Sequence, residues 1–131
     1  MAPISVNLLP SDPPVGTVML IGEHDAFSSG RLENELGVLL DAGIRVVVDL
    51  REATFIDSQT LSVLLAARHH AEEADLGFTV VLGDTDYTQV HRLLDITGLR
   101  SAFAIYPTFE EAAAAASTGA VGGDRTRARA G

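Results

Sequence analysis

Two short runs of β-branched residues limit the folds open to this chain. Residues 44–50 (IRVVVDL) and 78–82 (FTVVL) are almost continuously apolar, which is typical of strands that are buried on both faces of a sheet. The segments between and beyond these runs carry apolar residues at helical spacing instead. The first two such stripes contain Leu32, Leu36, Leu39 and Leu40, and Leu61, Leu64 and Leu65. Strands that alternate with amphipathic helices predict a mostly parallel sheet with helices packed on it.

The remaining segments complete the predicted order ββαβαβαβα. Residues 4–8 and 15–21 predict two antiparallel strands, because the proline-rich segment 10–14 between them is typical of a turn. A short strand is predicted over residues 103–106. Helices are predicted over residues 29–40, about 58–75, 86–97 and 108–116. The predicted fold class is therefore α/β, with a small, mixed, mostly parallel β-sheet packed by about four α-helices.

Short polar motifs predict where the later helices begin and end. The pairs Asp86 with Gln89 and Thr108 with Glu111 have the spacing of a capping box. Gly98 follows a helical stripe, so we expect it to end that helix in the left-handed conformation. We expect residues 1–116 to form one domain and residues 117–131, which are small, polar or basic, to be a disordered tail.

Charge composition excludes several classes of function. The chain has nine arginines, no lysine and no cysteine, which excludes lysine-dependent phosphate loops, Schiff-base chemistry and zinc–thiolate sites. The net charge is −9, and the domain itself is more negative because Arg125, Arg127 and Arg129 lie in the tail. A negative domain repels phosphate backbones, so nucleic-acid binding is disfavoured. No run is long and apolar enough for a membrane helix, and no signal-peptide core is present. We therefore expect a cytoplasmic protein.

Asp49 and the histidines are the remaining candidates for chemical sites. Asp49 ends a buried run, so it has the position of a receiver-domain phospho-acceptor, but such domains also need a lysine. The favoured interpretation is a strand-end residue that pairs with Arg51. The four histidines lack the spacing of metal ligands. We expect no metal, no cofactor and no catalytic residues.

The segment FIDSQTL at residues 55–61 is the most informative junction between a strand and a helix. Asp57 or Ser58 is the natural N-cap of the helix that follows. The hydroxyl of Ser58 would stand at the first turn, where a phosphate would face free N–H groups and the positive end of the helix. Phosphorylation there would add roughly −1.5 to −2 charges without unfolding the chain. A plain helix cap and a phosphorylation switch both fit the segment.

Four segments, in this order, resemble the STAS domain of anti-sigma factor antagonists. Residues 22–25 (GEHD) resemble the G-E-[LI]-D loop of the family, and residues 46–50 (VVVDL) resemble its central strand. Residues 55–58 (FIDS) resemble its F-[IML]-D-S phosphorylation motif, and residues 93–99 (LLDITGL) resemble its L-[LF]-x-[LI]-[ST]-G-L segment. The resemblance extends from about residue 15 to residue 116.

The resemblance implies a STAS fold and a binding activity without catalysis. It implies that the chain binds an anti-sigma factor, often an ATP-binding serine kinase, and thereby releases a sigma factor in a partner-switching stress response. The kinase would phosphorylate Ser58, and a PP2C-type phosphatase would restore binding. A monomer or weak dimer, with no direct contact to nucleic acid or membrane, is expected. The implied partner-binding residues are Gly22, Glu23, His24, Asp25, Asp57, Ser58, Gln59, Thr60 and Leu61.

Two departures from the family pattern bear on the expected partner-binding surface. Thr60 replaces the glycine of D-S-[ST]-G-[LI], which brings a second hydroxyl close to the expected partner and makes Thr60 a secondary phosphorylation candidate. His24 stands at the usual aliphatic position of the loop. An alternative function is a STAS interaction module with a non-kinase partner such as a transporter ATPase. A nucleotide-binding domain or an enzyme is disfavoured, because the chain lacks a glycine-rich phosphate loop and a paired acid–base signature.

Overall fold

The computed structural model describes residues 3–122 of the chain, and its main feature is a five-stranded sheet. The strand order is β1-β2-β4-β6-β7. β1 pairs antiparallel with β2, while the other neighbours pair in parallel. The strands are β1 (Ile4–Leu9), β2 (Val15–Leu20), β4 (Arg45–Asp49), β6 (Phe78–Val81) and β7 (Ala104–Tyr106). The predicted mixed, mostly parallel sheet with an antiparallel pair at its N-terminal edge is confirmed.

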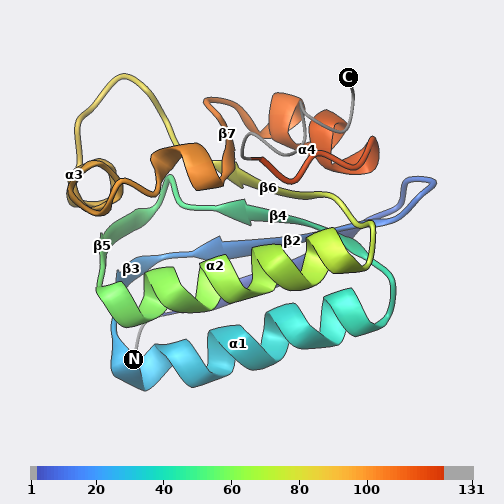
Figure 1. Cartoon of the computed structure of the whole chain (residues 1–131), viewed down its shortest axis with the longest axis horizontal. Helices are drawn as coiled ribbons and strands as arrows, with labels where there is room; N and C mark the ends of the chain where they lie inside the picture. The colour runs from blue at the N-terminus through green and yellow to red at the C-terminus, as the bar shows by residue number, and fades with distance from the viewer. Residues whose placement is uncertain (1–2, 123–131) are drawn as a thin grey trace.

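Helices cover both faces of this sheet (Figure 1). α1 and α2 lie side by side on one face and begin at the same end of the sheet, whereas α4 lies on the opposite face. Their bounds are α1 (Ala26–Asp41), α2 (Ser58–Glu73), α3 (Gln89–Thr97), the 3₁₀ helix η1 (Arg100–Ala102) and α4 (Phe109–Ser117). None of the helices within residues 3–122 has the length and apolar character needed to cross a membrane.

The side chains of β4 alternate between two apolar cores. Val46 and Val48 pack into the larger core with α1 and α2, while Val47 packs into a smaller core that includes Ala112 and Ala116 of α4. All three valines are fully buried. This alternation confirms the prediction that residues 44–50 form a strand covered on both faces, because successive side chains of a strand point to opposite faces.

A second, two-stranded sheet is the main difference from the predicted element order. Gly22–His24, expected as a loop, forms strand β3, which pairs in parallel with β5 (Ala53–Ile56). Gly22 has a φ of +81°, a left-handed conformation that glycine adopts without strain and that separates β3 from β2. Strands of three and four residues are too short to show a periodic pattern, so the sequence did not predict this pair.

The helix-capping predictions had mixed outcomes. Gly98 ends α3 with a φ of 72°, as predicted. Thr108 caps α4 by accepting the N–H of Glu111, which is one half of the predicted capping box. The capping box of Asp86 with Gln89 is wrong, because Thr88 is the N-cap of α3 and accepts the N–H of His91. The predicted start of α1 at residue 29 is too late, because Asp25 is the N-cap and the helix begins at Ala26.

The packed domain extends beyond the predicted boundary at residue 116. The Ala120 carbonyl accepts the N–H of Phe78 at 2.7 Å, and Val121 is only 3% exposed. Residues 117–122, which we expect from the sequence to belong to the tail, therefore include a segment packed beside β6, where it completes the hydrogen bonding of that strand. Arg125, Arg127 and Arg129 lie outside the described residues.

Candidate functional site

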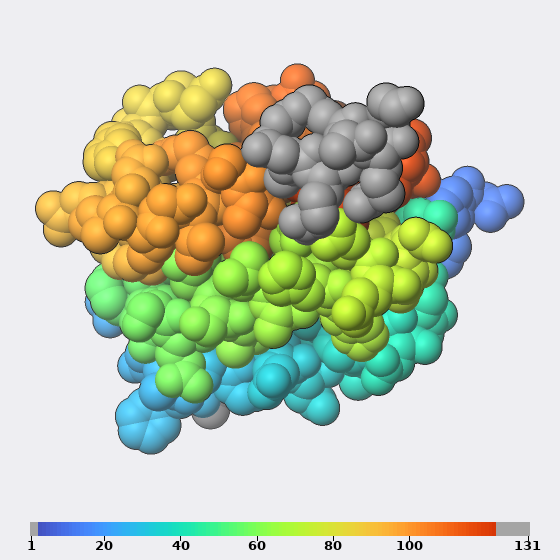
Figure 2. Space-filling model, viewed as in Figure 1, coloured from blue at the N-terminus to red at the C-terminus, as the bar shows by residue number. Residues whose placement is uncertain are grey.

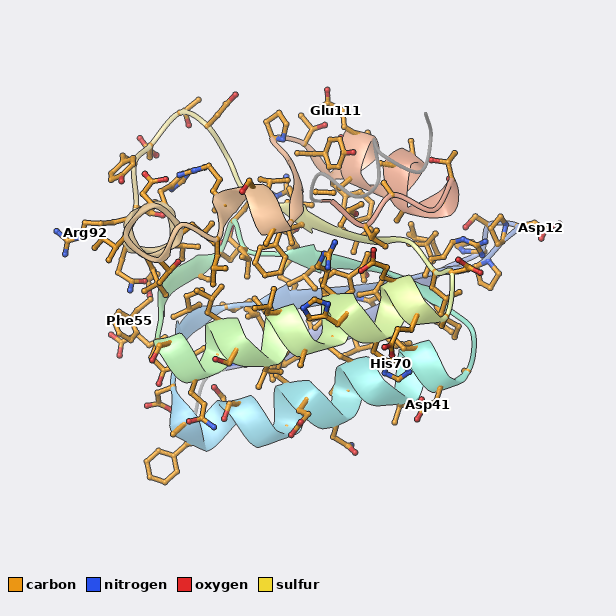
Figure 3. The ribbon with its side chains drawn as sticks, viewed as in Figure 1. Asp12, Asp41, Phe55, His70, Arg92 and Glu111 are labelled. Atoms are coloured by element: carbon orange, nitrogen blue, oxygen red, sulfur yellow. The ribbon has the colours of Figure 1, made fainter. Side chains whose placement is uncertain are left out.

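The β3–β5 pair brings the GEHD and FIDS segments together at one end of the molecule. His24 is opposite Ile56 in the register of this pair, and the His24 carbonyl accepts the N–H of Asp57 at 3.2 Å. In Figure 3, Phe55 of β5 lies at this end, while Asp12 of the β1–β2 turn lies at the opposite end. Two segments about thirty residues apart in sequence therefore form one surface, which we call the β3–β5 end and which comprises residues 22–25 and 55–61.

Ser58 occupies the first position of α2 and is exposed. Asp57 precedes it in an extended conformation and caps the helix, with its carboxylate accepting the N–H of Thr60 at 2.8 Å. Asp57 is therefore the N-cap, and the Ser58 hydroxyl has no hydrogen-bond partner in the part of the chain that the structure describes. A phosphate on this hydroxyl would lie beside the open, positive end of α2.

Thr60 is fully buried, and its hydroxyl is turned towards the interior. The hydroxyl oxygen lies 2.8 Å from Asp57 Oδ1 and 3.3 Å from the His24 carbonyl oxygen. The hydroxyl is therefore not presented at the surface in this conformation, which disfavours Thr60 as a secondary phosphorylation site. Thr60 instead links the N-cap of α2 to β3, which is a structural role that a glycine cannot perform.

The nine predicted partner-binding residues separate into accessible and buried groups. The side chains of His24 and Thr60 are fully buried, and that of Leu61 is 2% exposed. These three side chains pack beneath the surface of the free chain, so their contact with a partner stays a prediction. The accessible or half-buried residues are Gly22, Glu23, Asp25, Asp57, Ser58 and Gln59.

The buried imidazole of His24 connects β3 to the first turn of α1. Nε2 lies 3.1 Å from the Ile21 carbonyl, so this nitrogen carries the proton and donates it. Nδ1 lies 3.1 Å from the hydroxyl oxygen of Ser28. Burial lowers the pKa of His24 below its ordinary value, although the nearby Ile21 and Pro3 carbonyls and the Asp25 carboxylate oppose this effect. Both ring nitrogens have partners, so the ring is not placed to act as a base for Ser58.

A pH-dependent stability follows from the lowered pKa of His24. In the unfolded chain the imidazole has a pKa of about 6.5. Below that pH the unfolded state therefore binds more protons than the folded state, in which the pKa of His24 is lower. We expect the free energy of unfolding to fall from pH 6.5 towards the folded-state pKa, with a slope of at most about 1.4 kcal/mol per pH unit. Urea unfolding of the wild type and His24→Leu between pH 7.5 and 5 measures this contribution.

The matched control for this prediction is His70→Gln. His70 lies near the far end of α2, where its Nε2 is 3.4 Å from Asp41 of α1 (Figure 3), and both side chains are substantially exposed. This variant should retain the wild-type fall in stability, whereas His24→Leu should show a smaller one. The same pH slope in His24→Leu and the wild type would contradict the assignment to His24.

Gln89 is a positioning residue that the sequence did not reveal. Its side-chain amide pairs with the backbone of Ile56 in both directions: Oε1 accepts the Ile56 N–H, and Nε2 donates to the Ile56 carbonyl, each at 2.9 Å. The amide therefore satisfies the backbone of Ile56 as a neighbouring strand would. It thereby connects α3 to Ile56, the residue before Asp57. No sequence signal distinguishes this use of a glutamine from helix capping.

Asp49 and Arg51 form the predicted ion pair. Asp49 is 2% exposed, and the Arg51 guanidinium donates to both of its carboxylate oxygens, at 3.0 and 2.7 Å. This pairing raises the pKa of Arg51, chiefly through the hydrogen bond to Asp49. The carboxylate is therefore occupied by the guanidinium. Among residues 3–122, no three or more histidine or acidic side chains are grouped to hold a metal ion.

Comparison with known proteins assigns a family to this arrangement. Residues 8–112 match the family model of the STAS domain. The crystal structure of an anti-sigma factor antagonist from Mycobacterium paratuberculosis is similar to this chain, with a TM-score of 0.71 and 28% sequence identity. The alignment covers 87% of this chain and 94% of that one. No match was found among curated protein sequences.

More distant structures share the fold. SpoIIAA, an anti-sigma factor antagonist, in its unphosphorylated form has a TM-score of 0.63 at 12% identity, over 95% of this chain and 98% of that one. The phosphorylated form of the Bacillus cell fate determinant SpoIIAA has a TM-score of 0.61 at 14% identity, over 84% and 97%. These similarities confirm the predicted α/β architecture.

Proposed function

Because the chain belongs to the STAS domain family, we propose that it is an anti-sigma factor antagonist controlled by phosphorylation of Ser58. The unphosphorylated chain binds an anti-sigma factor that is itself an ATP-binding serine kinase, and this binding releases a sigma factor. The kinase phosphorylates Ser58 and so ends the binding, and a PP2C-type phosphatase restores it. These steps place the protein in the cytoplasm, where sigma factors act on RNA polymerase. The similarity to the Mycobacterium paratuberculosis antagonist supports this proposal.

The exposed hydroxyl of Ser58 is the observation that carries the proposal. A kinase must reach the hydroxyl without unfolding its substrate, and Ser58 meets this condition because it begins a helix at the surface. Asp57, just before it, has an extended backbone with φ −99° and ψ 178°. The neighbouring Gly22–His24 strand, fixed by its pairing with β5, supplies a second segment of the same surface for partner binding.

Incubation with the anti-sigma serine kinases of the source organism and MgATP, followed by intact-mass measurement and peptide mapping, tests the proposal. We expect one phosphate, located on Ser58, and none on Ser58→Ala. Ser62→Ala is the matched control, because Ser62 is an exposed serine one turn further along α2, and this variant should be phosphorylated like the wild type. Thr60 should remain unmodified because it is buried.

The same experiment separates this proposal from the alternative STAS function. A stable complex that forms without phosphate transfer would favour a partner that does not act as the kinase. Neither binding nor phosphate transfer would favour a STAS module with a different partner, such as a transporter ATPase. Phosphate on any residue other than Ser58 would contradict the assigned site while retaining a kinase as the partner.

A further inference from the structure

Phe27 is an almost fully exposed aromatic residue. It is the second residue of α1, and its side chain is 98% exposed. Because the ring buries so little surface, it contributes almost nothing to the hydrophobic stability of the domain. The backbone beneath it is nevertheless well anchored, since the Phe27 N–H donates to Asp25 Oδ1 at 2.9 Å. An exposed ring on a fixed turn is suited to an interaction surface.

The position of this ring connects it with the β3–β5 end. α1 begins directly after β3, α2 begins directly after β5, and these two strands are paired. The first turns of α1 and α2 therefore lie at the same end of the molecule, as Figure 1 shows. In the space-filling view, the beginning of α1, in light blue, projects from the lower left of this end (Figure 2). A partner that covers Ser58 also approaches the first turn of α1.

A pocket of about 680 Å³ lies beside Phe27. Its lining includes apolar side chains and two carboxylates: Pro3, Ile21, Phe27, Glu23 and Asp25. None of the lining residues within residues 3–122 carries a positive charge. Arg31, one turn further along α1, donates to the Ile4 carbonyl at 3.2 Å and lies 3.8 Å from Glu35. The surface around the exposed ring is therefore apolar with a negative border.

We propose that Phe27 is the apolar anchor with which the chain docks on its anti-sigma factor. The complementary partner surface is a hydrophobic pocket bordered by arginine or lysine, which would face Glu23 and Asp25. This inference rests on the proposed function and deepens it by assigning the docking chemistry to a residue that is not the phospho-acceptor. Aromatic residues that are exposed in the free protein and buried on binding are typical interface hot spots.

The test measures binding to the purified kinase that phosphorylates Ser58, by titration calorimetry without ATP. Phe27→Ala should raise Kd by about thirtyfold, which is the expected scale for burying one phenyl ring. Its thermal midpoint should match the wild type, because the ring is exposed and alanine is a good helix former. In kinase assays the variant should raise KM more than it lowers kcat, since Phe27 positions the substrate without contacting the reacting hydroxyl.

Two further variants make the test specific. Val38→Ala removes another exposed apolar side chain of α1, 59% exposed and three turns away from Phe27, and should leave Kd unchanged. Glu23→Gln should lower the association rate and reduce its dependence on salt, because it removes one charge from the border of the pocket.

The outcomes distinguish this inference from the proposed function. If the wild type binds and Phe27→Ala has the same Kd, the anchor is overturned and the proposed function stands. The same conclusion holds if Val38→Ala weakens binding as much as Phe27→Ala does. A wild-type chain that binds none of the organism's anti-sigma kinases overturns both. Tight wild-type binding with a selective loss in Phe27→Ala supports both.

Discussion

Phosphorylation of Ser58 is expected to weaken binding to the anti-sigma factor by about a thousandfold, which corresponds to roughly 4 kcal/mol. The hydroxyl of Ser58 is exposed in the free chain and, under the proposed function, lies within the docking surface. A phosphate there carries roughly −1.5 to −2 charges and must lose its hydration when the partner docks. The fold itself should not change, because an anion at this position faces the N-terminus of α2.

Nearby carboxylates increase the expected effect. Asp57 adjoins Ser58 and is half-buried, and two exposed acidic residues lie nearby: Glu23 in β3, which pairs with β5, and Asp25 directly after β3. The net charge of the chain is −9. The cations that we propose on the partner would already be paired with Glu23 and Asp25, so they offer the phosphate little compensation. Desolvation and repulsion by like charges are therefore largely uncompensated.

The measurement compares Kd for the unphosphorylated chain, the phosphorylated chain, Ser58→Ala and Ser58→Asp. Ser58→Ala should bind like the unphosphorylated wild type, whereas Ser58→Asp should bind weakly but remain folded. Ser11→Asp adds a charge to the exposed β1–β2 turn, next to Asp12 at the opposite end of the molecule (Figure 3), and should have no effect. Equal affinity of the phosphorylated and unphosphorylated chains would refute the switch.

The parts of the fold that sequence could predict are those with strong local signals. The valines of β4 form an unbroken apolar run because both faces of the strand are covered. Gly98 ends α3 because glycine adopts the left-handed conformation without strain. Asp57 caps α2 through its own side chain, which is a contact between residues three apart. Each of these features depends on neighbouring residues, so a single sequence reveals it.

The features that sequence did not predict depend on contacts between distant segments. Thr60 was expected at the surface, yet its hydroxyl lies 3.3 Å from the carbonyl of His24, 36 residues away. Gln89 pairs with the backbone of Ile56 across 33 residues. In both cases the residue type allows several hydrogen-bonding roles, and only the β3–β5 pair determines which one is used. A motif indicates Ser58 as the candidate phospho-acceptor, but the accessible surface around it could not be predicted from the sequence.

Replacement of Arg68 should have the largest effect on stability among the variants considered, because this arginine is buried and joins distant parts of the chain. It is 2% exposed on α2. Its Nε donates to the Val121 carbonyl and its Nη2 to the Gly122 carbonyl, each at 3.0 Å. Its Nη1 lies 3.3 Å from the Glu72 carboxylate. Arg68 thereby holds the segment after α4, which the sequence suggested was disordered, against the domain.

We expect Arg68→Ala to lower the free energy of unfolding by about 3–5 kcal/mol, since it leaves a half-buried carboxylate and two carbonyls without these donors and opens a cavity. Arg68→Met should recover part of the loss, because it restores volume without hydrogen bonds. Arg31→Ala is the matched control: Arg31 and Glu35 have the same i,i+4 spacing but are more exposed, so the loss should be below about 1 kcal/mol. Urea unfolding followed by circular dichroism measures all three variants, since the chain lacks tryptophan. If Arg68→Ala lost no more stability than Arg31→Ala, the segment after α4 would not depend on the arginine for its place in the fold.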